Sequence, residues 1–170
     1  MKILVMGGAG DMGSRTVEDL AEKEGVEKVT IGDRDSRRAG EIAAALEKAP
    51  AQVSAASLDA LDHASMVKAM KEHDLVASAL GPFYLFETRL VRAALEAGVD
   101  YISICDDWCA AQDTIIRFDG AAREKGRTVV TGCGVSPGMS NLLVEGKTLA
   151  ARCQPFRLAF LPDSVCAGHE

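Results

Sequence analysis

Residues 2–13 read KILVMGGAGDMG, an apolar run that leads directly into a glycine-rich turn. The run has the length of a buried strand, and its glycines stand at the spacing G-x-G-x-x-G. In such a turn the first glycine permits a tight bend, the second lets a pyrophosphate approach the backbone, and the third lets helix and strand pack closely. The stretch therefore predicts a strand, a phosphate-binding turn and a helix. The turn residues expected at a dinucleotide cofactor are Gly8, Gly10, Asp11, Met12 and Gly13.

A carboxylate at the end of the next expected strand supports this interpretation. Asp33 follows Gly13 by about 20 residues, the interval at which such a carboxylate accepts hydrogen bonds from the adenosine ribose. An aspartate in this place could instead cap the helix that follows it, and the sequence leaves this alternative open.

The choice between NAD and NADP depends on the residues beside Asp33. Its carboxylate would repel the 2′-phosphate of NADP, whereas Arg34, together with Arg37 and Arg38, could hold that phosphate. The three arginines could equally form a solvated helix face. Both cofactors remain possible, with a weak preference for NAD because the carboxylate occupies the position that reads the ribose.

The rest of the chain alternates short apolar runs with segments of helical periodicity. This alternation is typical of βαβ units and predicts an α/β fold, a doubly wound Rossmann-type parallel sheet with helices on both faces. The expected strands are Lys2–Met6, Lys28–Gly32, Ala51–Ala56, Leu75–Leu80, Tyr101–Ile104 and Thr128–Thr131. The expected helices are Met12–Glu24, Ser36–Lys48, Asp62–Lys71, Glu87–Ala97, Trp108–Lys125 and Met139–Ala150.

The C-terminal residues differ in character from the rest. Residues 1–150 are expected to form an NAD(P)-binding domain, and Pro155 interrupts the helical pattern after it. Phe156–Leu161 is expected to be a further strand that begins an incomplete second domain. We therefore interpret residues 151–170 as the start of a substrate or dimerisation domain, or as a tail. Because this strand would leave an apolar edge, a homo-oligomer contact through it is possible.

The residues that follow each expected strand are candidates for the site, because ligands of an open α/β sheet lie outside the carboxyl ends of its strands. Asp59 could reach the adenine, or it could be an ordinary turn aspartate. Gly81, Pro82 and Phe83 would form a rigid corner near the nicotinamide half of the cofactor, unless they only start a helix.

Two later loops are candidates for the substrate side. Asp106, beside Asp107, could face a substrate or cap the next helix. Residues 132–141 combine three glycines, a proline and a Ser-Asn pair, so their backbone amides could point at a ligand. The candidates for a substrate groove are Asp106, Gly134, Pro137, Gly138, Met139 and Ser140.

Composition narrows the class of partner. The net charge of -6 and the pI near 5.1 argue against nucleic-acid binding, which needs clustered Lys and Arg. No apolar stretch reaches the roughly 18 residues of a membrane span, and the short N-terminal run lacks the features of an export signal, which favours a cytoplasmic location. Cys105 and Cys109 have no second ligand pair at metal-site spacing, so no metal is expected. No histidine stands in a strand-end loop, and the catalytic residues stay unknown.

Taken together, these motifs resemble the N-terminal NAD(P)-binding domain of the saccharopine dehydrogenase family. The resemblance rests on GGAGDMG (7–13), IGDR (31–34), GPF (81–83), EAGVDYISICDD (96–107) and GCGVSPGMSN (132–141). It implies that the turn residues, Asp33 and Arg34 contact the dinucleotide, and that the later loops border the nicotinamide and the substrate.

The resemblance also implies an activity. Such enzymes are oxidoreductases of amino-acid metabolism that transfer hydride at a C–N bond of a small amino-acid-derived substrate. Family members continue into a further domain that completes the substrate pocket, so we interpret this chain as the cofactor-binding part of such an enzyme. The alternative is a non-catalytic NAD(H)-sensing or regulatory module, which the shortness of the chain favours and its substrate-facing loops disfavour.

Overall fold

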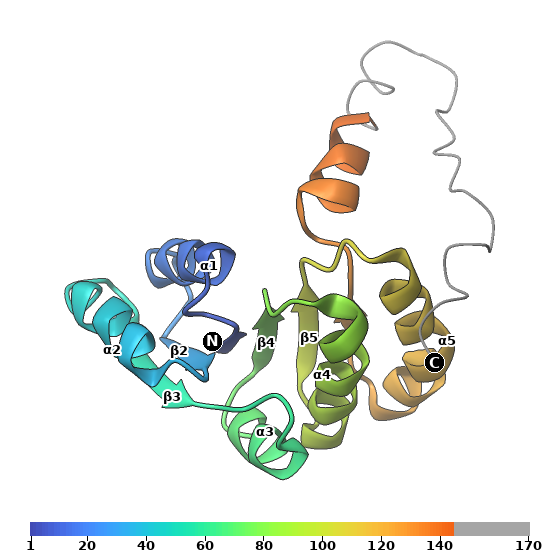
Figure 1. Ribbon diagram of the computed structural model, residues 1–170, viewed down its shortest axis with the longest axis horizontal. Coiled ribbons are helices and arrows are strands. Elements are labelled where there is room, and N and C mark those ends of the chain that lie inside the picture. Colours follow the sequence, from blue (N-terminus) through green and yellow to red (C-terminus); the bar gives the residue numbers. More distant parts are fainter. Residues whose placement is uncertain (145–170) are drawn as a thin grey trace.

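The computed structural model describes residues 1–144, which form a single sheet flanked by helices (Figure 1). The strands are β1 (Lys2–Met6), β2 (Lys28–Asp33), β3 (Gln52–Ser57), β4 (Leu75–Ser78), β5 (Asp100–Ser103) and β6 (Val129–Val130). The helices are α1 (Asp11–Ala21), α2 (Ser36–Ala45), α3 (His63–Met70), α4 (Phe83–Ala97) and α5 (Trp108–Lys125). The strand order is β3-β2-β1-β4-β5-β6, with every pair parallel, which confirms the doubly wound Rossmann-type architecture.

The central strand β1 pairs with β2 on one side and with β4 on the other, and the three strands end at the same edge of the sheet. Met6, its last residue, pairs with Gly32 of β2 and with Ser78 of β4. The chain then grows toward β3 on one side and toward β6 on the other, so the strand order reverses between β1 and β4. Ligands of open α/β sheets bind at such a reversal, outside the carboxyl ends of the strands.

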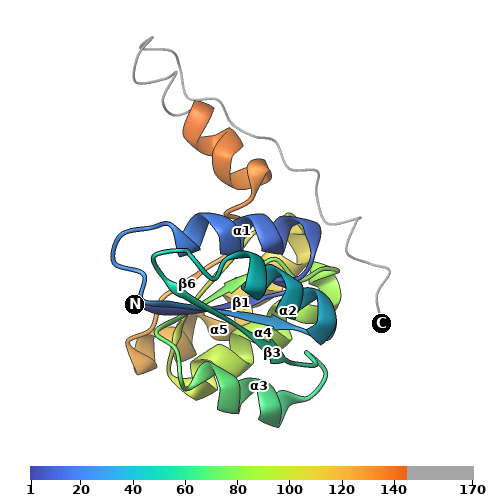
Figure 2. The same ribbon diagram turned by 90° about the vertical axis from the view of Figure 1, so that its left-hand side faces the viewer.

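Alternation along β1 divides the core into two layers. Ile3 and Val5 pack on the side of α1 and α2, whereas Leu4 and Met6 pack on the side of α3 and α4. Figure 2 shows α1 on one face of the sheet and α3 on the other. Because each of these four side chains is at most 2% exposed, each contributes about 1.5–3 kcal/mol of hydrophobic burial.

Side-chain caps and glycines fix the helix ends. The starts of α2, α3 and α5 each have an aspartate whose carboxylate accepts the backbone N–H of the residue three positions later. These aspartates are Asp35, Asp62 and Asp107, with distances of 2.9, 3.1 and 3.0 Å. Helices α4 and α5 end at Gly98 and Gly126, which have φ values of 75° and 60°. These two glycines adopt the left-handed conformation that is common for a glycine at the C-terminal end of a helix.

Two helices begin four residues earlier than the sequence predicts, and α1 begins one residue earlier, at Asp11. Helix α4 begins at Phe83 rather than Glu87, because extended Pro82 is its N-terminal boundary and the aromatic residues after it already turn. The helix expected at Met139–Ala150 is preceded by a kinked turn, Val135–Met139, in which Ser136 is extended (φ -121°, ψ 131°), and helical residues 140–144 follow. This last segment projects away from the sheet in Figures 1 and 2.

Some expectations lie outside the described residues. They are the strand Phe156–Leu161, the second domain or tail at residues 151–170 and the oligomer contact through that strand. Within residues 1–144, no helix is both long enough and apolar enough to cross a membrane.

Candidate functional site

The predicted site residues follow the carboxyl ends of parallel strands and so lie at one edge of the sheet. Four of them, Asp33, Arg34, Asp59 and Gly81, surround one pocket that adjoins the glycine-rich turn. The candidates for the substrate side follow β5 and β6, farther along the same edge. The structure therefore groups three residues of the expected adenosine side with Gly81 of the expected nicotinamide side, and leaves the other candidates outside this pocket.

The turn after β1 bends at Gly7, one residue before the first glycine of the predicted motif. Gly7 has a φ of +71°, which favours glycine. Its N–H donates to the Gly32 carbonyl at 2.9 Å, and its own carbonyl accepts the N–H of Gly10 at 3.0 Å. The tight bend expected at Gly8 is thus made by the glycine that precedes it.

The last two glycines of the motif, Gly10 and Gly13, form a cradle around the Gly7 carbonyl. A Cβ at Gly13 would overlap this carbonyl oxygen, and a Cβ at Gly10 would lie 3.2 Å from it. Gly10 is also the N-cap of α1 and gives the helix no side-chain hydrogen bond. The first amides of α1 are therefore free of a side-chain cap, and the cradle suits the pyrophosphate of a dinucleotide.

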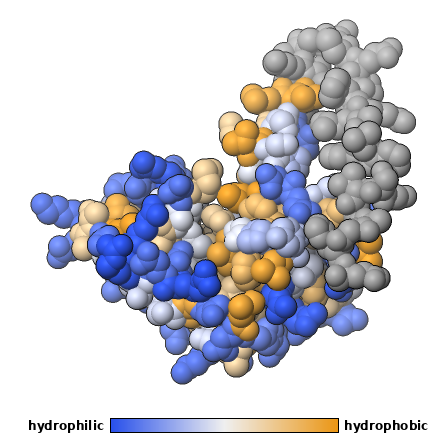
Figure 3. All heavy atoms as spheres, in the orientation of Figure 1, coloured by the Kyte–Doolittle hydropathy of each residue, from blue (hydrophilic) through white to orange (hydrophobic). Residues whose placement is uncertain are grey.

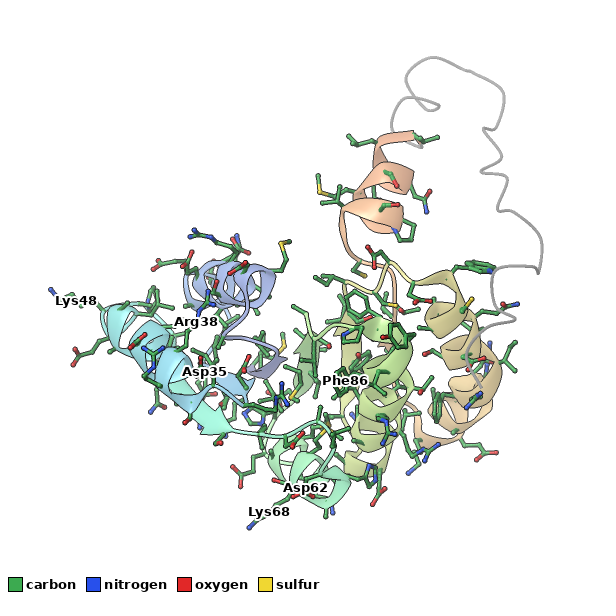
Figure 4. The ribbon with its side chains drawn as sticks, in the orientation of Figure 1. Asp35, Arg38, Lys48, Asp62, Lys68 and Phe86 are labelled. Carbon is green, nitrogen blue, oxygen red and sulfur yellow. The ribbon has the colours of Figure 1, made fainter. Side chains whose placement is uncertain are left out.

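Asp33 joins the end of β2 to this turn. One carboxylate oxygen accepts the N–H of Ala9 at 3.0 Å, and the other accepts the N–H of Asp35 at 3.0 Å. The cap of α2 is Asp35, which accepts the N–H of Arg38 (Figure 4). The helix-capping alternative for Asp33 is therefore excluded.

The pocket beside Asp33 has a volume of about 130 Å³, an apolar wall and a charged rim. Leu58 and Phe86 contribute to the wall, and Asp33, Arg34 and Asp59 contribute charge. The residues around it are Met6, Gly7, Gly32, Asp33, Arg34, Leu58, Asp59, Ala60, Leu61, Leu80, Gly81 and Phe86. Sequence reasoning missed the apolar members, although the pattern Leu-Asp-Ala-Leu after β3 places two leucines at a strand end.

The three candidate arginines have different surroundings. Arg37 forms an ion pair with Glu41 at 2.7 Å, and Arg38 bridges from α2 to Asp11 of α1 at 3.0 Å. Arg34 is exposed at the pocket and forms no ion pair within residues 1–144. Of the three, Arg34 is the guanidinium available to an anion at this pocket.

Asp59 and the corner after β4 combine a structural role with a place near the pocket. The Asp59 carboxylate accepts the N–H of Leu61 at 2.9 Å, so it is a turn aspartate that also lines the pocket. Gly81 lines the pocket as well, whereas Pro82 and Phe83 stand beyond it at the start of α4.

The candidate residues after β5 and β6 are divided between capping, packing and exposed positions. Asp107 caps α5, and Asp106 beside it is exposed. In the last loop the Met139 N–H donates to the Gly134 carbonyl at 3.0 Å, and the Ser140 hydroxyl donates to the Pro137 carbonyl at 3.1 Å. Gly138 is packed closely, since a Cβ there would lie 2.8 Å from the Gly132 carbonyl oxygen.

A buried acid near these loops was not anticipated. Glu87 of α4 is fully buried and accepts hydrogen bonds from the hydroxyls of Tyr101, Ser103 and Thr131. Its burial could have been predicted from helical periodicity, because Glu87 shares a helix face with the buried Leu90.

Other reactive groups in residues 1–144 have structural partners or raised pKa values. His73 is buried between the Thr30 hydroxyl and the Ala69 carbonyl, each at 2.8 Å. Burial raises the pKa of the Cys105 thiol to about 11 and also raises the pKa of Cys133. Neither thiol is therefore an activated thiolate at neutral pH. No group of three or more His, Cys, Asp or Glu in this part of the chain could hold a metal ion.

Comparison with known families gives one match over most of the chain. Residues 3–130, which run from β1 to the end of β6, match the family described as "Saccharopine dehydrogenase NADP binding domain". The family description names NADP and gives no support to a preference for NAD.

Curated relatives are distant and much longer. A "Lipid droplet localized protein" of Caenorhabditis elegans is 26% identical over 138 residues, which are 78% of this chain and 32% of the relative. A "Trans-acting enoyl reductase" of Mycobacterium tuberculosis is 23% identical over 142 residues, 84% of this chain and 34% of the relative. The chain thus spans about a third of the length of these relatives.

Solved structures agree on the fold. Apo saccharopine dehydrogenase (L-Glu forming) of Saccharomyces cerevisiae superposes with a TM-score of 0.73 at 21% identity, over 89% of this chain and 31% of that enzyme. A shikimate 5-dehydrogenase of Mycobacterium fortuitum superposes with a TM-score of 0.55 at 23% identity, over 77% of this chain and 44% of that enzyme.

Proposed function

Because the chain belongs to the family of saccharopine dehydrogenase NADP-binding domains, we propose that it binds NADP(H) across the carboxyl ends of β1–β4 as the cofactor-binding part of an oxidoreductase. The observation that carries the proposal is the pocket that joins Asp33, Arg34, Asp59 and Gly81 beside the glycine cradle. The bound cofactor supplies a hydride, and the residues of this chain bind and orient it.

Each part of the site has a role in this proposal. The amides after Gly10 hold the pyrophosphate, and Asp33 supports their turn through Ala9 while its remaining lone pairs face the ribose. Leu58 and Leu61 offer apolar contact to the adenine, with Asp59 at the rim. Residues 81–83 border the nicotinamide half.

The preference for NADP over NAD depends on Arg34. A 2′-phosphate beside Asp33 would meet like charge, and the nearby guanidinium compensates for this repulsion with charge-assisted hydrogen bonds. Arg34 is suited to this because, within residues 1–144, no carboxylate forms an ion pair with it.

Substitution of Arg34 tests this assignment. In fluorescence titrations, we expect Arg34→Ala to raise the Kd for NADPH by about tenfold or more, and to leave the Kd for NADH within about twofold. Arg37→Ala is the matched control, because Arg37 is an exposed arginine already paired with Glu41. Equal losses for both nucleotides would refute the 2′-phosphate role, and a wild-type chain that binds neither nucleotide would refute the proposed function.

For the reaction, we propose hydride transfer at a C–N bond of an amino-acid-derived substrate. Asp106 is exposed and unused by the cap of α5, so its carboxylate can attract an ammonium group at the substrate side. The loop with Gly134 and residues 137–140 would border the same substrate. In a protein that includes the substrate domain proposed below, oxidation of NADPH should follow addition of an amino acid with a 2-oxo acid. Oxidation with an enoyl thioester alone would favour the reaction named for the mycobacterial relative.

The architecture of the whole protein is part of the proposal. We propose that a substrate or dimerisation domain begins after the Rossmann unit, since the curated relatives are about three times as long as the match. We also propose a cytoplasmic location, which cell fractionation would test. Recovery with lipid droplets would contradict it and agree with the name of the nematode relative.

A further inference from the structure

Glu87 is a carboxylate inside the protein core. It lies in the second turn of α4 and is 0% exposed. Buried carboxylates need compensation by a cation or by several hydrogen-bond donors. Within residues 1–144 Glu87 has no ion pair. Tyr101 donates to one oxygen at 2.9 Å, while Ser103 and Thr131 donate to the other, the latter at 2.9 Å.

The sheet brings these three hydroxyls together. Tyr101 and Ser103 are two residues apart on β5, so both point to the face covered by α4. Thr131 directly follows β6, whose Val130 pairs with Ile102 of β5. One carboxylate on the helix is therefore bonded to the carboxyl ends of two neighbouring strands.

The bonded strand ends continue into the loops on the substrate side. The Ser103 carbonyl accepts the N–H of Cys133 at 2.9 Å, and its hydroxyl accepts the N–H of Cys105 at 3.5 Å. Cys105 immediately precedes Asp106, and Cys133 immediately precedes Gly134. The corner at residues 81–83 is one helical turn before Glu87. One carboxylate is thus linked through hydrogen bonds to the two loops on the predicted substrate side, and through α4 to the corner at residues 81–83.

Stability does not account for an acid at this position. Replacement of a buried charged network by apolar side chains of similar volume is often neutral or stabilising, because the charge no longer has to be desolvated. A fully bonded buried network fixes the distances between the elements that it joins.

We propose that Glu87 is a positioning residue that holds the corner after β4 and the loops after β5 and β6 in the geometry required by the nicotinamide half of the cofactor. The proposal rests on NADP(H) binding at this edge, as proposed above. Glu87 acts through the backbone segments that it ties together, without contact with the cofactor.

Glu87→Gln tests this role, because glutamine keeps the shape of the side chain and removes one of the two acceptor oxygens. We expect the Kd for NADPH to rise by about tenfold, as is common when supporting hydrogen bonds of a site are removed. The Kd for adenosine 2′,5′-bisphosphate, which lacks the nicotinamide, should stay within about twofold. The enhancement of NADPH fluorescence on binding should fall as well.

Val91→Ala is the control for lost stability, because Val91 is buried in the same helix and has no part in the network. It should lower the Tm and leave the ratio of the two Kd values unchanged. If Glu87→Gln does not fold, Ser103→Ala removes a single donor and should change the ratio in the same direction. An unchanged ratio, or equal losses for both ligands, would overturn the positioning role. Failure of the wild-type chain to bind adenosine 2′,5′-bisphosphate would instead overturn the proposed function.

Discussion

Gly13 sits where the first turn of α1 crosses the Gly7 carbonyl, and no side chain fits there. A Cβ would overlap the Gly7 oxygen and lie 2.8 Å from the Gly8 Cα. Backbone atoms cannot retreat as the end of a flexible side chain can. The packing of the fold therefore requires a glycine at this position of the motif, in addition to any requirement of the ligand.

Gly13→Ala should destabilise the protein by about 1–3 kcal/mol, because the new methyl group forces the turn and the helix apart. Gly120→Ala is the matched control, since Gly120 lies inside α5, where a new Cβ would meet no neighbouring atom within 4 Å. In a helix interior, replacing glycine by alanine should raise the free energy of unfolding by about 0.5–1 kcal/mol. Urea unfolding measures both changes, and equal stability of the two variants would contradict the steric argument.

Because the Cys105 thiol is buried, we expect the folded protein to lose stability at alkaline pH. Its burial, with the nearby Glu87 charge, raises the pKa to about 11, while the unfolded chain releases this proton near pH 9. Between these two values the unfolded state binds fewer protons, so the free energy of unfolding falls as the pH rises. The expected loss is on the order of 1–2 kcal/mol by pH 11.

Cys105→Ser isolates this contribution, because serine does not titrate in the same range. Its stability should fall less steeply between pH 9 and pH 11 than that of the wild type. A part of the slope should remain, since burial also raises the pKa of Tyr101 well above its ordinary value. Identical slopes would show that Cys105 does not carry the effect.

At the scale of elements, two neighbouring aspartates after β5 differ in whether they cap a helix. Asp107 accepts the N–H of Ala110 at 3.0 Å and caps α5, whereas Asp106 is exposed. Asp107→Ala should cost about 1 kcal/mol of stability. Asp106→Ala should change stability by less than about 0.5 kcal/mol, as surface substitutions do. Thermal unfolding separates the two, and an equal cost would contradict the division of roles.

The sequence predicts the elements well where one signal dominates. The start of β1 and the whole of α5 agree residue for residue, because an apolar run or an Asp-to-Gly span marks each one clearly. The start of α4 was missed, since Phe83 and the aromatic residues after it resemble a loop and have no polar cap. The kinked turn at Val135–Met139 has no local pattern that distinguishes it from a glycine-rich loop.

At the scale of the whole molecule, the candidate site was predicted only in part. The glycines and charged residues at strand ends follow from local spacing, so Asp33 and Arg34 could be named in advance. The apolar wall of the pocket needs the strand order, because Leu58 and Phe86 come from distant parts of the sequence. The network around Glu87 needs both the register and the burial of α4.

An apolar surface on the projecting segment gives a prediction for the intact chain. Val135, Met139, Leu142 and Leu143 are each more than half exposed, and Figure 3 shows hydrophobic residues gathered on this segment. We expect the chain to bind a hydrophobic dye such as anilinonaphthalene sulfonate in its folded state. The double substitution Leu142→Ser and Leu143→Ser should remove most of the dye fluorescence.

Ile116→Ser is the control for this measurement, because Ile116 is 72% exposed but lies on α5, away from the projecting segment. It should leave most of the fluorescence intact. If Ile116→Ser and the double substitution reduce the signal equally, the dye does not report on the projecting segment.

The central place of β1 has a consequence for how the chain is made. A ribosome delivers β1 before both of its partners: β2 follows within a few tens of residues, but β4 arrives only with Leu75–Ser78. Until then one edge of the most apolar strand has no neighbour, and an open strand edge invites pairing with other chains. Parallel sheets also form slowly, because their contacts join distant residues. The interval between the synthesis of β1 and that of β4 is therefore a period in which the nascent chain is prone to mispairing.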